Sequence, residues 1–472
     1  MVFSSPIFLF LFLPLVLFAY LLTPRALKNT VLLGASLVFY AWGEGPYTVV
    51  MLGSILVNYL AGLVLMRFEG RVDARRRALA AIVGLNLALL IAFKYANFLA
   101  NNLNILLQAA GLPLLNVPPV HLPIGISFFT FHAISYVVDV YRGEARAQRN
   151  PINVALYVTL FPQLIAGPIL RYHDLAGQLG ARPHTTERFA YGVRRFIAGL
   201  GKKVLIANTL ALPADQIFAL APEHLAPGVA WLGIVCYALQ IYFDFSGYSD
   251  MAVGLGAMFG FRIMENFEHP YVATSMREFW RRWHISLSTW FRDYLYIPLG
   301  GSRGGAGRTV FNLVTVFFLC GLWHGASWTF ILWGLLHGFF LMIERLGVED
   351  RLRRAPRVLQ HVYVLLVLVL TWTFFRAESF GAAVHFLGML CGVNSGALPQ
   401  SVAMHATPAV WLALGLGIVC ATPLGVRVHA AVGRTAGYLY HGAVALGLAA
   451  IFLLATISMA SGTYNPFIYF RF

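Results

Sequence analysis

The chain has 472 residues, of which 59% are hydrophobic and only 11% are charged. Soluble domains carry about 25% charged residues, so this composition excludes an ordinary soluble protein and predicts a polytopic membrane protein. The formal net charge is +15 at pH 7. Because the basic residues cluster in short segments between apolar runs, we interpret this charge as the bias of cytoplasmic loops and expect no nucleic-acid partner.

Apolar runs follow one another from end to end, so we expect one all-α polytopic membrane domain that covers residues 1–472. The first run, residues 6–22, has neither a basic leader nor a small-residue cleavage site, which favours an uncleaved span over a signal peptide. We expect roughly ten to twelve membrane segments in all. The further runs are residues 30–42, 47–66, 78–98, 101–120, 122–140, 154–170, 204–220, 231–245, 251–261, 310–322, 361–375, 380–391, 408–420 and 443–459.

Short basic segments between these runs set the expected sidedness. The positive-inside rule places them in the cytoplasm, and the N-terminus is then outside. Two consecutive segments of this kind flank the run at residues 154–170, whose stretch FPQLIAGP carries two prolines and a glycine. We therefore expect a broken, re-entrant element there, with its backbone groups satisfied inside the protein. The basic segments are residues 67–77, 142–149, 194–203 and 351–357.

Several polar features accompany these runs. Residues 171–203 are expected on the cytoplasmic surface, with an amphipathic helix from about Thr186. The stretch YFDFSGYSD at residues 242–250 is expected to break a helix, with Asp244 and Asp250 in cap or network roles. The aromatic end, residues 465–472, suits the membrane interface. The cysteines have no metal-like spacing and are interpreted as small core residues: Cys236, Cys320, Cys391 and Cys420.

The segment from Arg277 to His337 combines charged and aromatic residues with apolar runs. It includes a glycine-rich basic turn at residues 300–308, where we expect a break, and it carries His324 to membrane depth. Ionisable residues in spans are costly and indicate function by default. His324 is either a helix-packing residue or a general base, because a neutral imidazole can accept a proton from a hydroxyl nucleophile. His284 is either an interfacial anchor or a second polar group beside His324.

Other polar residues of this segment have simpler explanations. We interpret His337 as structural, because it lies too far from His324 along one helix for a shared site, and Asp293 as the partner of a local arginine. A basic rim of arginines either reflects the positive-inside bias or forms a mouth for the phosphates of a nucleotide-containing acyl donor. The rim consists of Arg281, Arg282, Arg303 and Arg308. Patterns for serine hydrolases, phosphate loops, dinucleotide binding and zinc proteases are absent, and no metal site is expected.

The stretches FWRRWHISLSTW (residues 279–290), RDYLY (292–296) and LWHG (322–325) resemble the membrane-bound O-acyltransferase (MBOAT) family, in particular its bacterial alginate O-acetylation branch. The resemblance extends to MVFSS, FKYANF, LPIGISF, LIAGP and YFDFSGYSD, and so to about Glu378. It implies a helical bundle with re-entrant elements and a central pore, and a catalytic core at about residues 120–345. It also implies that His324 is the essential histidine and His284 the upstream motif histidine.

The resemblance further implies acetyl-CoA as a cytoplasmic acyl donor and no permanently bound cofactor. We expect the donor to contact Arg281, Arg282, Arg303 and Trp323. The acetyl group would cross the bacterial inner membrane and pass to a separate periplasmic or membrane-anchored acetyltransferase. That partner would modify a polysaccharide, alginate or a related exopolysaccharide. The surrounding lipids are the other expected partner.

Two alternatives to the acyltransferase remain open at this point. Broken helices and buried polar residues also suit a transporter or flippase for a glycan or lipid-linked intermediate, although the repeated halves common in transporters are absent. A non-catalytic membrane scaffold for a polymer-export machine is the third interpretation. Release of free CoA separates the enzyme from the transporter, and an inert His324 substitution would favour the scaffold.

Overall fold

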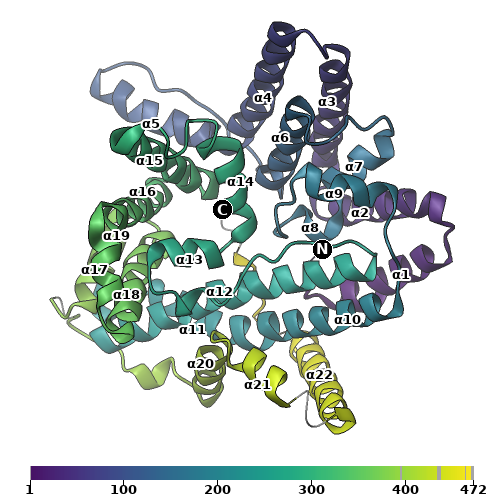
Figure 1. The fold of residues 1–472 in the computed structure, drawn as a ribbon. Helices are drawn as coiled ribbons and strands as arrows, with labels where there is room; N and C mark the ends of the chain where they lie inside the picture. The colour runs from purple at the N-terminus through teal and green to yellow at the C-terminus, as the bar shows by residue number, and fades with distance from the viewer. Residues whose placement is uncertain (1, 394–395, 433–436, 463, 469–472) are drawn as a thin grey trace. The chain divides into compact units, whose positions relative to one another are not determined.

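The computed structural model describes residues 2–393, 396–432, 437–462 and 464–468, and its ribbon is drawn in Figure 1. The chain forms two compact units. Unit 1 consists of Met1–Ala190 and Leu255–Met264, and unit 2 consists of Tyr191–Gly254 and Glu265–Phe472. Residues 469–472, the last four of the predicted aromatic end, lie outside the described residues.

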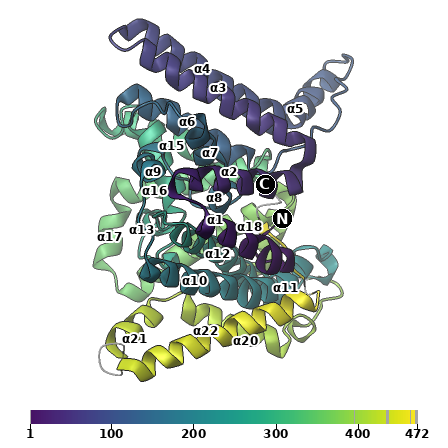
Figure 2. The ribbon, with the colours of Figure 1, turned by 90° about the vertical axis from the view of Figure 1, so that its right-hand side faces the viewer.

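Unit 1 is built from short and long helices, of which α3 and α4 lie side by side (Figure 2). The predicted separation of the second and third runs is confirmed, because Gly45 adopts a left-handed φ of 53° and Pro46 follows it. The helices are α1 (Leu13–Leu22), α2 (Lys28–Glu44), α3 (Thr48–Arg67), α4 (Val72–Lys94), α5 (Ala96–Ala109), α6 (Ile126–Arg142), α7 (Pro151–Thr159), α8 (Phe161–Leu164) and α9 (Tyr172–Gly180).

The predicted break in the run at residues 154–170 is also confirmed. Helix α7 ends where Leu160 leaves the helical region at φ −48° and ψ 108°, and the single turn of α8 follows. A Cβ atom on Gly125 would lie 2.7 Å from the carbonyl oxygen of Leu164, so the backbones of α8 and the start of α6 touch. Every residue of α8 is buried. Whether this element is re-entrant in the membrane stays a prediction.

Unit 2 contains most of each remaining helix. The first residues of α10 and the last residues of α12 belong to unit 1. The remaining helices are α10 (Thr186–Gly201), α11 (Asn208–Phe218), α12 (Pro227–Met258), α13 (Met276–Arg282), α14 (Ile285–Phe291), α15 (Gly305–His324), α16 (Trp328–Ile343), α17 (Glu349–Arg354), α18 (Arg357–Arg376), α19 (Phe380–Leu390), α20 (Pro408–Cys420), α21 (Leu424–Val432) and α22 (Gly437–Ala460).

The helix predicted from about Thr186 is confirmed, because α10 begins at that residue, but it continues beyond the polar segment that ends at residue 203. A π-helical turn, Lys202–Ala207, joins α10 to α11, so that Thr186–Phe218 is one continuous helix. Lys203 is buried and pairs with Asp244 of α12, and the basic residues Arg195 and Lys202 pair with Asp250 of the same helix. The basic face of this helix is therefore turned toward acidic residues of unit 2.

The predicted helix break at residues 242–250 is wrong, because α12 continues without interruption from Pro227 to Met258. A Cβ atom on Gly247 would lie 2.7 Å from the carbonyl oxygen of Gly199, and one on Gly199 would lie 2.5 Å from the carbonyl oxygen of Gly247. The glycine therefore permits close packing of two helices rather than a turn. The network roles of Asp244 and Asp250 are confirmed, whereas a cap role is excluded by their mid-helix position.

Helices α15 and α16 form a tight antiparallel pair. The predicted break at residues 300–308 precedes it, where Gly300 and Gly301 both have positive φ. A Cβ atom on Gly321 would lie 2.4 Å from the carbonyl oxygen of Phe330, so the two backbones touch. His324 ends α15 and His337 lies on α16. The premise that both histidines belong to one helix was therefore wrong.

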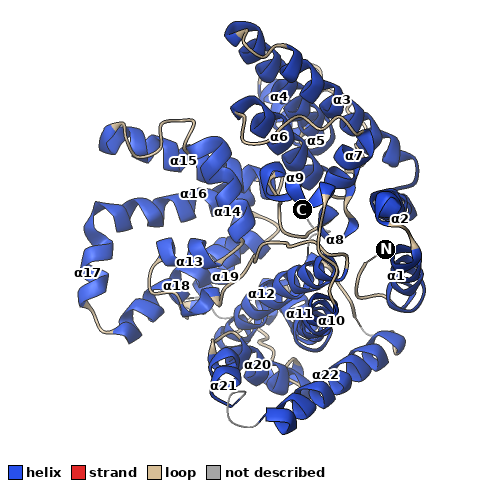
Figure 3. Ribbon diagram, turned by 45° about the vertical axis from the view of Figure 1, so that its right-hand side comes forward, coloured by secondary structure: helices blue, strands red, loops and turns tan. Residues whose placement is uncertain are grey.

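All regular elements of the described residues are helices, as Figure 3 shows, which confirms the all-α fold class. Among the described residues, eight helices are long and apolar enough to cross a membrane, or nine if the bent pair α20 and α21 is one span; Arg25–Arg67, which contains α2 and α3, counts once. With the shorter apolar helices Phe8–Leu22 and Phe380–Leu390 the total reaches the expected ten to twelve segments. Cys236 and Cys320 are buried as predicted, but Cys391 and Cys420, at helix ends, are exposed.

Candidate active site

His324 is the last residue of α15, where the extended backbone of Gly325 ends the helix. Its side chain is buried among aromatic rings of unit 2. The ring centroids of Trp323, Trp333 and Phe375 lie 4.9, 4.8 and 5.4 Å from that of the imidazole, all in edge-on arrangements. These rings leave the imidazole few orientations, which suits a group that must hold a reacting atom in place.

His284 and His324 line the same small cavity. Its volume is about 10 Å³, close to the minimum that holds one water molecule. Any ligand larger than one water molecule would therefore require the lining side chains to move. The other lining residues come from α12, the segment after α13, α16, α18 and the C-terminal segment: Ile241, Phe245, Trp283, Trp333, Trp372, Phe375 and Ile468.

His284 is held in an unusual backbone conformation between α13 and α14. It is fully buried and adopts the left-handed region, with φ 45° and ψ 53°. The Oδ1 atom of Asn266 lies 3.2 Å from Nδ1 of His284 and accepts bonds from the backbone N–H and the hydroxyl of Ser286. Because Oδ1 can only accept, Nδ1 carries the proton, and Nε2 is the acceptor nitrogen of a neutral ring. Burial lowers the pKa of His284 to about 3, so the ring stays neutral.

Asn266 is a residue of this site that sequence reasoning missed. Its Nδ2 atom donates to the hydroxyl of Ser249 at 3.2 Å, and its backbone carbonyl accepts the N–H of Ile285. One amide thus fixes both the tautomer of His284 and the start of α14. A polar residue in a loop after an apolar run gives no signal of this role in the sequence.

Substitution of His284 should separate its chemical role from its backbone role. We expect His284→Asn to keep the left-handed turn, which asparagine tolerates, and His284→Ala to strain it. If His284 orients a substrate, both variants should retain residual activity, with the asparagine variant closer to wild type in thermal stability. The measurement is enzymatic activity and unfolding midpoint in the same preparations. Wild-type activity in both variants would return His284 to a packing role.

The arginines that the sequence grouped into one rim have separate environments. Arg281 lines a polar hollow beside α13. Arg282 is paired with Glu278 at 2.8 Å and also donates to the carbonyl of Glu268. Arg303 is exposed in the turn before α15, and Arg308 donates to the carbonyl of Leu299. Of these four, only Arg281 lines that hollow.

Three further residues named from the sequence lie in separate environments. Trp323 is buried with its ring centroid 6.2 Å from that of His284, and it does not line the arginine hollow, so its contact with the donor stays a prediction. Asp293 accepts from Arg292 at 2.7 Å, which confirms the predicted local ion pair. His337 accepts a hydrogen bond at Nδ1 from Trp280 Nε1 at 3.3 Å, consistent with a structural role.

The C-terminal segment is attached to the wall of this cavity through a buried ion pair. Lys203 Nζ lies 2.7 Å from Oδ1 of Asp244, and it also donates to Asn208 and to the carbonyl of Pro466. The other carboxylate oxygen of Asp244 accepts the backbone N–H of Ile468 at 2.9 Å. Ile468 in turn lines the histidine cavity.

Phe467 and Ile468, in the described part of the aromatic end, are buried within the protein, and the predicted position of this end at the membrane interface stays a prediction. The physical reason for their burial is that the backbone of this segment satisfies two buried charges. A charged residue within an apolar run must find a partner, so Asp244 was the available signal in the sequence.

An all-helical, multi-pass membrane protein with two buried histidines at one cavity is the class that this fold and site define. The chain belongs to the membrane-bound O-acyltransferase family, whose sequence model matches residues 121–375. It is thus a membrane O-acyltransferase, which separates it from the transporter and scaffold alternatives.

The relatives carry related names. The chain is similar to a "probable alginate O-acetylase" of Pseudomonas putida, with 43% identity over the whole of both chains. It is similar to a "probable alginate O-acetylase" of Pseudomonas aeruginosa, with 50% identity over 81% of this chain and 73% of the relative. A peptidoglycan O-acetyltransferase of Helicobacter pylori is 35% identical over 84% of this chain and 81% of the relative.

Proposed function

We propose that the chain moves acetyl groups from cytoplasmic acetyl-CoA across the bacterial inner membrane for O-acetylation of an extracytoplasmic polysaccharide. The observation that carries this proposal is the cavity at which His324 and His284 meet. The names of the relatives support acetyl as the acyl group and a cell-envelope polymer as the destination. Alginate or a related exopolysaccharide is the favoured polymer.

In the proposed reaction His324 is the general base. It takes the proton from an acceptor hydroxyl while the hydroxyl oxygen attacks the carbonyl carbon of the thioester. The tetrahedral intermediate collapses, the carbon–sulfur bond breaks, and the leaving thiolate receives the proton from the imidazolium. The products are an acetyl ester and free CoA, so atoms and charges balance without a cofactor held by the protein.

His284 orients the reacting groups in this proposal. Its neutral ring offers Nε2 as an acceptor, as argued from the bond to Asn266, so it can accept a hydrogen bond from the acceptor hydroxyl. The aromatic walls, including Trp333 and Phe375, exclude water and limit hydrolysis of the thioester. Transfer then depends mainly on positioning, because the thioester is already activated.

The acetyl group is proposed to pass to a separate acetyltransferase in the periplasm or anchored in the membrane, which modifies the polymer. The test uses inverted inner-membrane vesicles from cells with and without the chain, supplied with radiolabelled acetyl-CoA. The chain should increase both the release of free CoA and the label on protein or polymer. Equal release in both kinds of vesicle would refute acetyl-CoA as donor.

Sidedness gives a separate prediction. Single cysteines placed at Val72 and Asp350 in a cysteine-free variant should be protected from a membrane-impermeant thiol reagent in intact cells, because the basic segments around them face the cytoplasm. Both positions are exposed at the protein surface. The control is labelling after the membrane has been opened with detergent. Labelling of either position in intact cells would overturn the topology.

The same method tests the proposed re-entrant element. Cysteines at Ala147 and Gly180 flank α7 and α8, and both should be protected if the chain enters and leaves by the cytoplasmic face. Labelling of one position but not the other in intact cells would make residues 154–170 a true span.

A further inference from the structure

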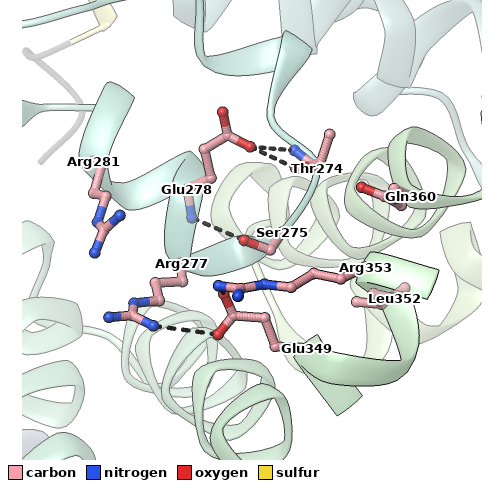
Figure 4. A pocket seen from close by; sticks show the side chains of 9 residues that line it. All are labelled: Thr274, Ser275, Arg277, Glu278, Arg281, Glu349, Leu352, Arg353 and Gln360. Atoms are coloured by element: carbon pink, nitrogen blue, oxygen red, sulfur yellow. Dashed lines mark hydrogen bonds and ion pairs between the residues drawn. The ribbon is translucent and has the colours of Figure 1, made fainter. Parts of the chain in front are cut away.

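A polar hollow of about 230 Å³ lies in unit 2 beside α13, separate from the histidine cavity (Figure 4). It is far larger than that cavity and is lined almost entirely by polar and charged side chains from α13, the two residues before it, α17 and α18. The lining residues are Thr274, Ser275, Arg277, Glu278, Arg281, Glu349, Leu352, Arg353 and Gln360.

Ion pairs hold two of the three arginines at the hollow. Glu349 accepts from Arg277 at 3.3 Å and from Arg353 at 2.7 Å, one contact at each carboxylate oxygen. Both arginine side chains are more than half exposed. A guanidinium has five N–H donors, so each arginine keeps donors for a ligand after it has bound the carboxylate.

The balance of charge at the hollow favours an anion. Arg281 has no interaction drawn to another lining side chain in Figure 4 and no ion pair with the described residues. The charge of Glu278 is compensated by Arg282, which is not a lining residue. One carboxylate, Glu349, then remains against three guanidinium groups.

Helix α13 connects this hollow to the histidine cavity. Arg277 and Arg281 are four residues apart and therefore lie on one face of the helix. Its other face is fixed in the protein, since Phe279 and Trp280 are buried and Trp280 bonds to His337. His284 follows Arg281 by three residues and Arg277 by seven, so at 1.5 Å per helical residue the two arginines lie about 5 and 10 Å from it along the helix axis.

We propose that this hollow binds the phosphate groups at the nucleotide end of the acyl donor, with Arg277, Arg281 and Arg353 as the ligands. Guanidinium groups match phosphate oxygens in pairs, which makes arginine the suitable residue here. The extended pantetheine arm of the donor covers the distance to His284. The proposal rests on the proposed function, in which acetyl-CoA is the donor, and on the cytoplasmic side expected for residues 351–357.

The test compares acetyl-CoA with S-acetylpantetheine, which has the same thioester but no phosphate. With the full chain in lipid nanodiscs, Arg281→Gln and Arg353→Gln should each raise the KM for acetyl-CoA about 10-fold and leave kcat little changed. Neither variant should alter the kinetics with S-acetylpantetheine. Adenosine 3′,5′-bisphosphate should inhibit the wild type competitively and the variants about 10-fold more weakly.

The matched control is Arg76→Gln, which removes an exposed arginine of unit 1 from another basic segment and should leave all these constants unchanged. Equal loss with both thioesters in the Arg281 and Arg353 variants would overturn the proposal and indicate a structural role. Unaltered KM in both variants would also overturn it. If the wild type turned over neither thioester, the proposed function itself would fail, which is a different result.

Anionic lipid headgroups offer the same phosphate chemistry, and the nanodisc composition distinguishes the two sources. In zwitterionic phosphatidylcholine nanodiscs the effect of Arg281→Gln on the KM for acetyl-CoA should persist at full size. If that effect and the inhibition by adenosine 3′,5′-bisphosphate appeared only in nanodiscs with phosphatidylglycerol, the hollow would be a lipid site and the proposal would be wrong.

Discussion

Replacement of His324 by alanine should reduce acetyl transfer by about 10²–10⁴-fold, the usual effect of losing a general base. The imidazole is enclosed by Trp323, Trp333 and Phe375, and His284, the other histidine of the cavity, is proposed to orient the substrate rather than to take the proton. The measurement is CoA release and polymer acetylation in membranes that contain equal amounts of each protein.

A second variant keeps this test independent of folding. His324→Gln retains a polar side chain of similar length but cannot act as a base near neutral pH, so it should be as inactive as the alanine variant while its unfolding midpoint stays close to that of the wild type. A partly exposed histidine outside the cavity, His224, provides the control substitution. Near-normal acetylation by a well-expressed His324→Ala protein would contradict the assignment of the base.

Breaking the buried ion pair between Lys203 and Asp244 should have the largest effect on stability. Each side chain is almost completely buried, and removal of one partner leaves an uncompensated charge. Such a loss is expected to lower the free energy of unfolding by about 3–5 kcal/mol. Lys203→Met and Asp244→Asn should therefore lower the unfolding midpoint strongly, as measured by tryptophan fluorescence on heating.

Activity should fall with stability in these variants, because Asp244 binds the backbone of Ile468 at the cavity wall. The double variant Lys203→Met with Asp244→Leu should recover much of the lost stability, since an apolar pair can replace a buried ion pair at little cost. It should not recover full activity, because the N–H of Ile468 has lost its acceptor.

The half-exposed pair of Arg292 and Asp293 is the comparison for this experiment. Arg292→Gln should change the free energy of unfolding by no more than about 1 kcal/mol, as is usual for a surface ion pair. If the single variants of Lys203 and Asp244 unfold at the same temperature as the wild type, the buried pair makes no contribution to the free energy of unfolding.

Some properties of this protein are local in the chain, and the sequence determined them. Long apolar runs exclude water-soluble folding, so the all-α membrane class follows from composition alone. The break near Pro162 and the turn at Gly45 were predictable because proline and glycine act on the backbone where they stand. His324 was recognisable as a functional candidate because an ionisable group in an apolar run is costly.

Other properties depend on which surfaces meet, and only the tertiary structure decided them. Gly247 and Gly199 look like helix breakers, yet they allow two continuous helices to touch. Lys203 resembles a surface residue until Asp244 and the C-terminal segment are placed against it. Arg281 and Arg282 are neighbours in the sequence, but the helix turns them by about 100°, so that one faces the hollow and the other pairs with Glu278. Periodicity in the sequence identifies which residues share one face of a helix. The residues that contact this face come from distant parts of the chain, so only the tertiary structure identifies them.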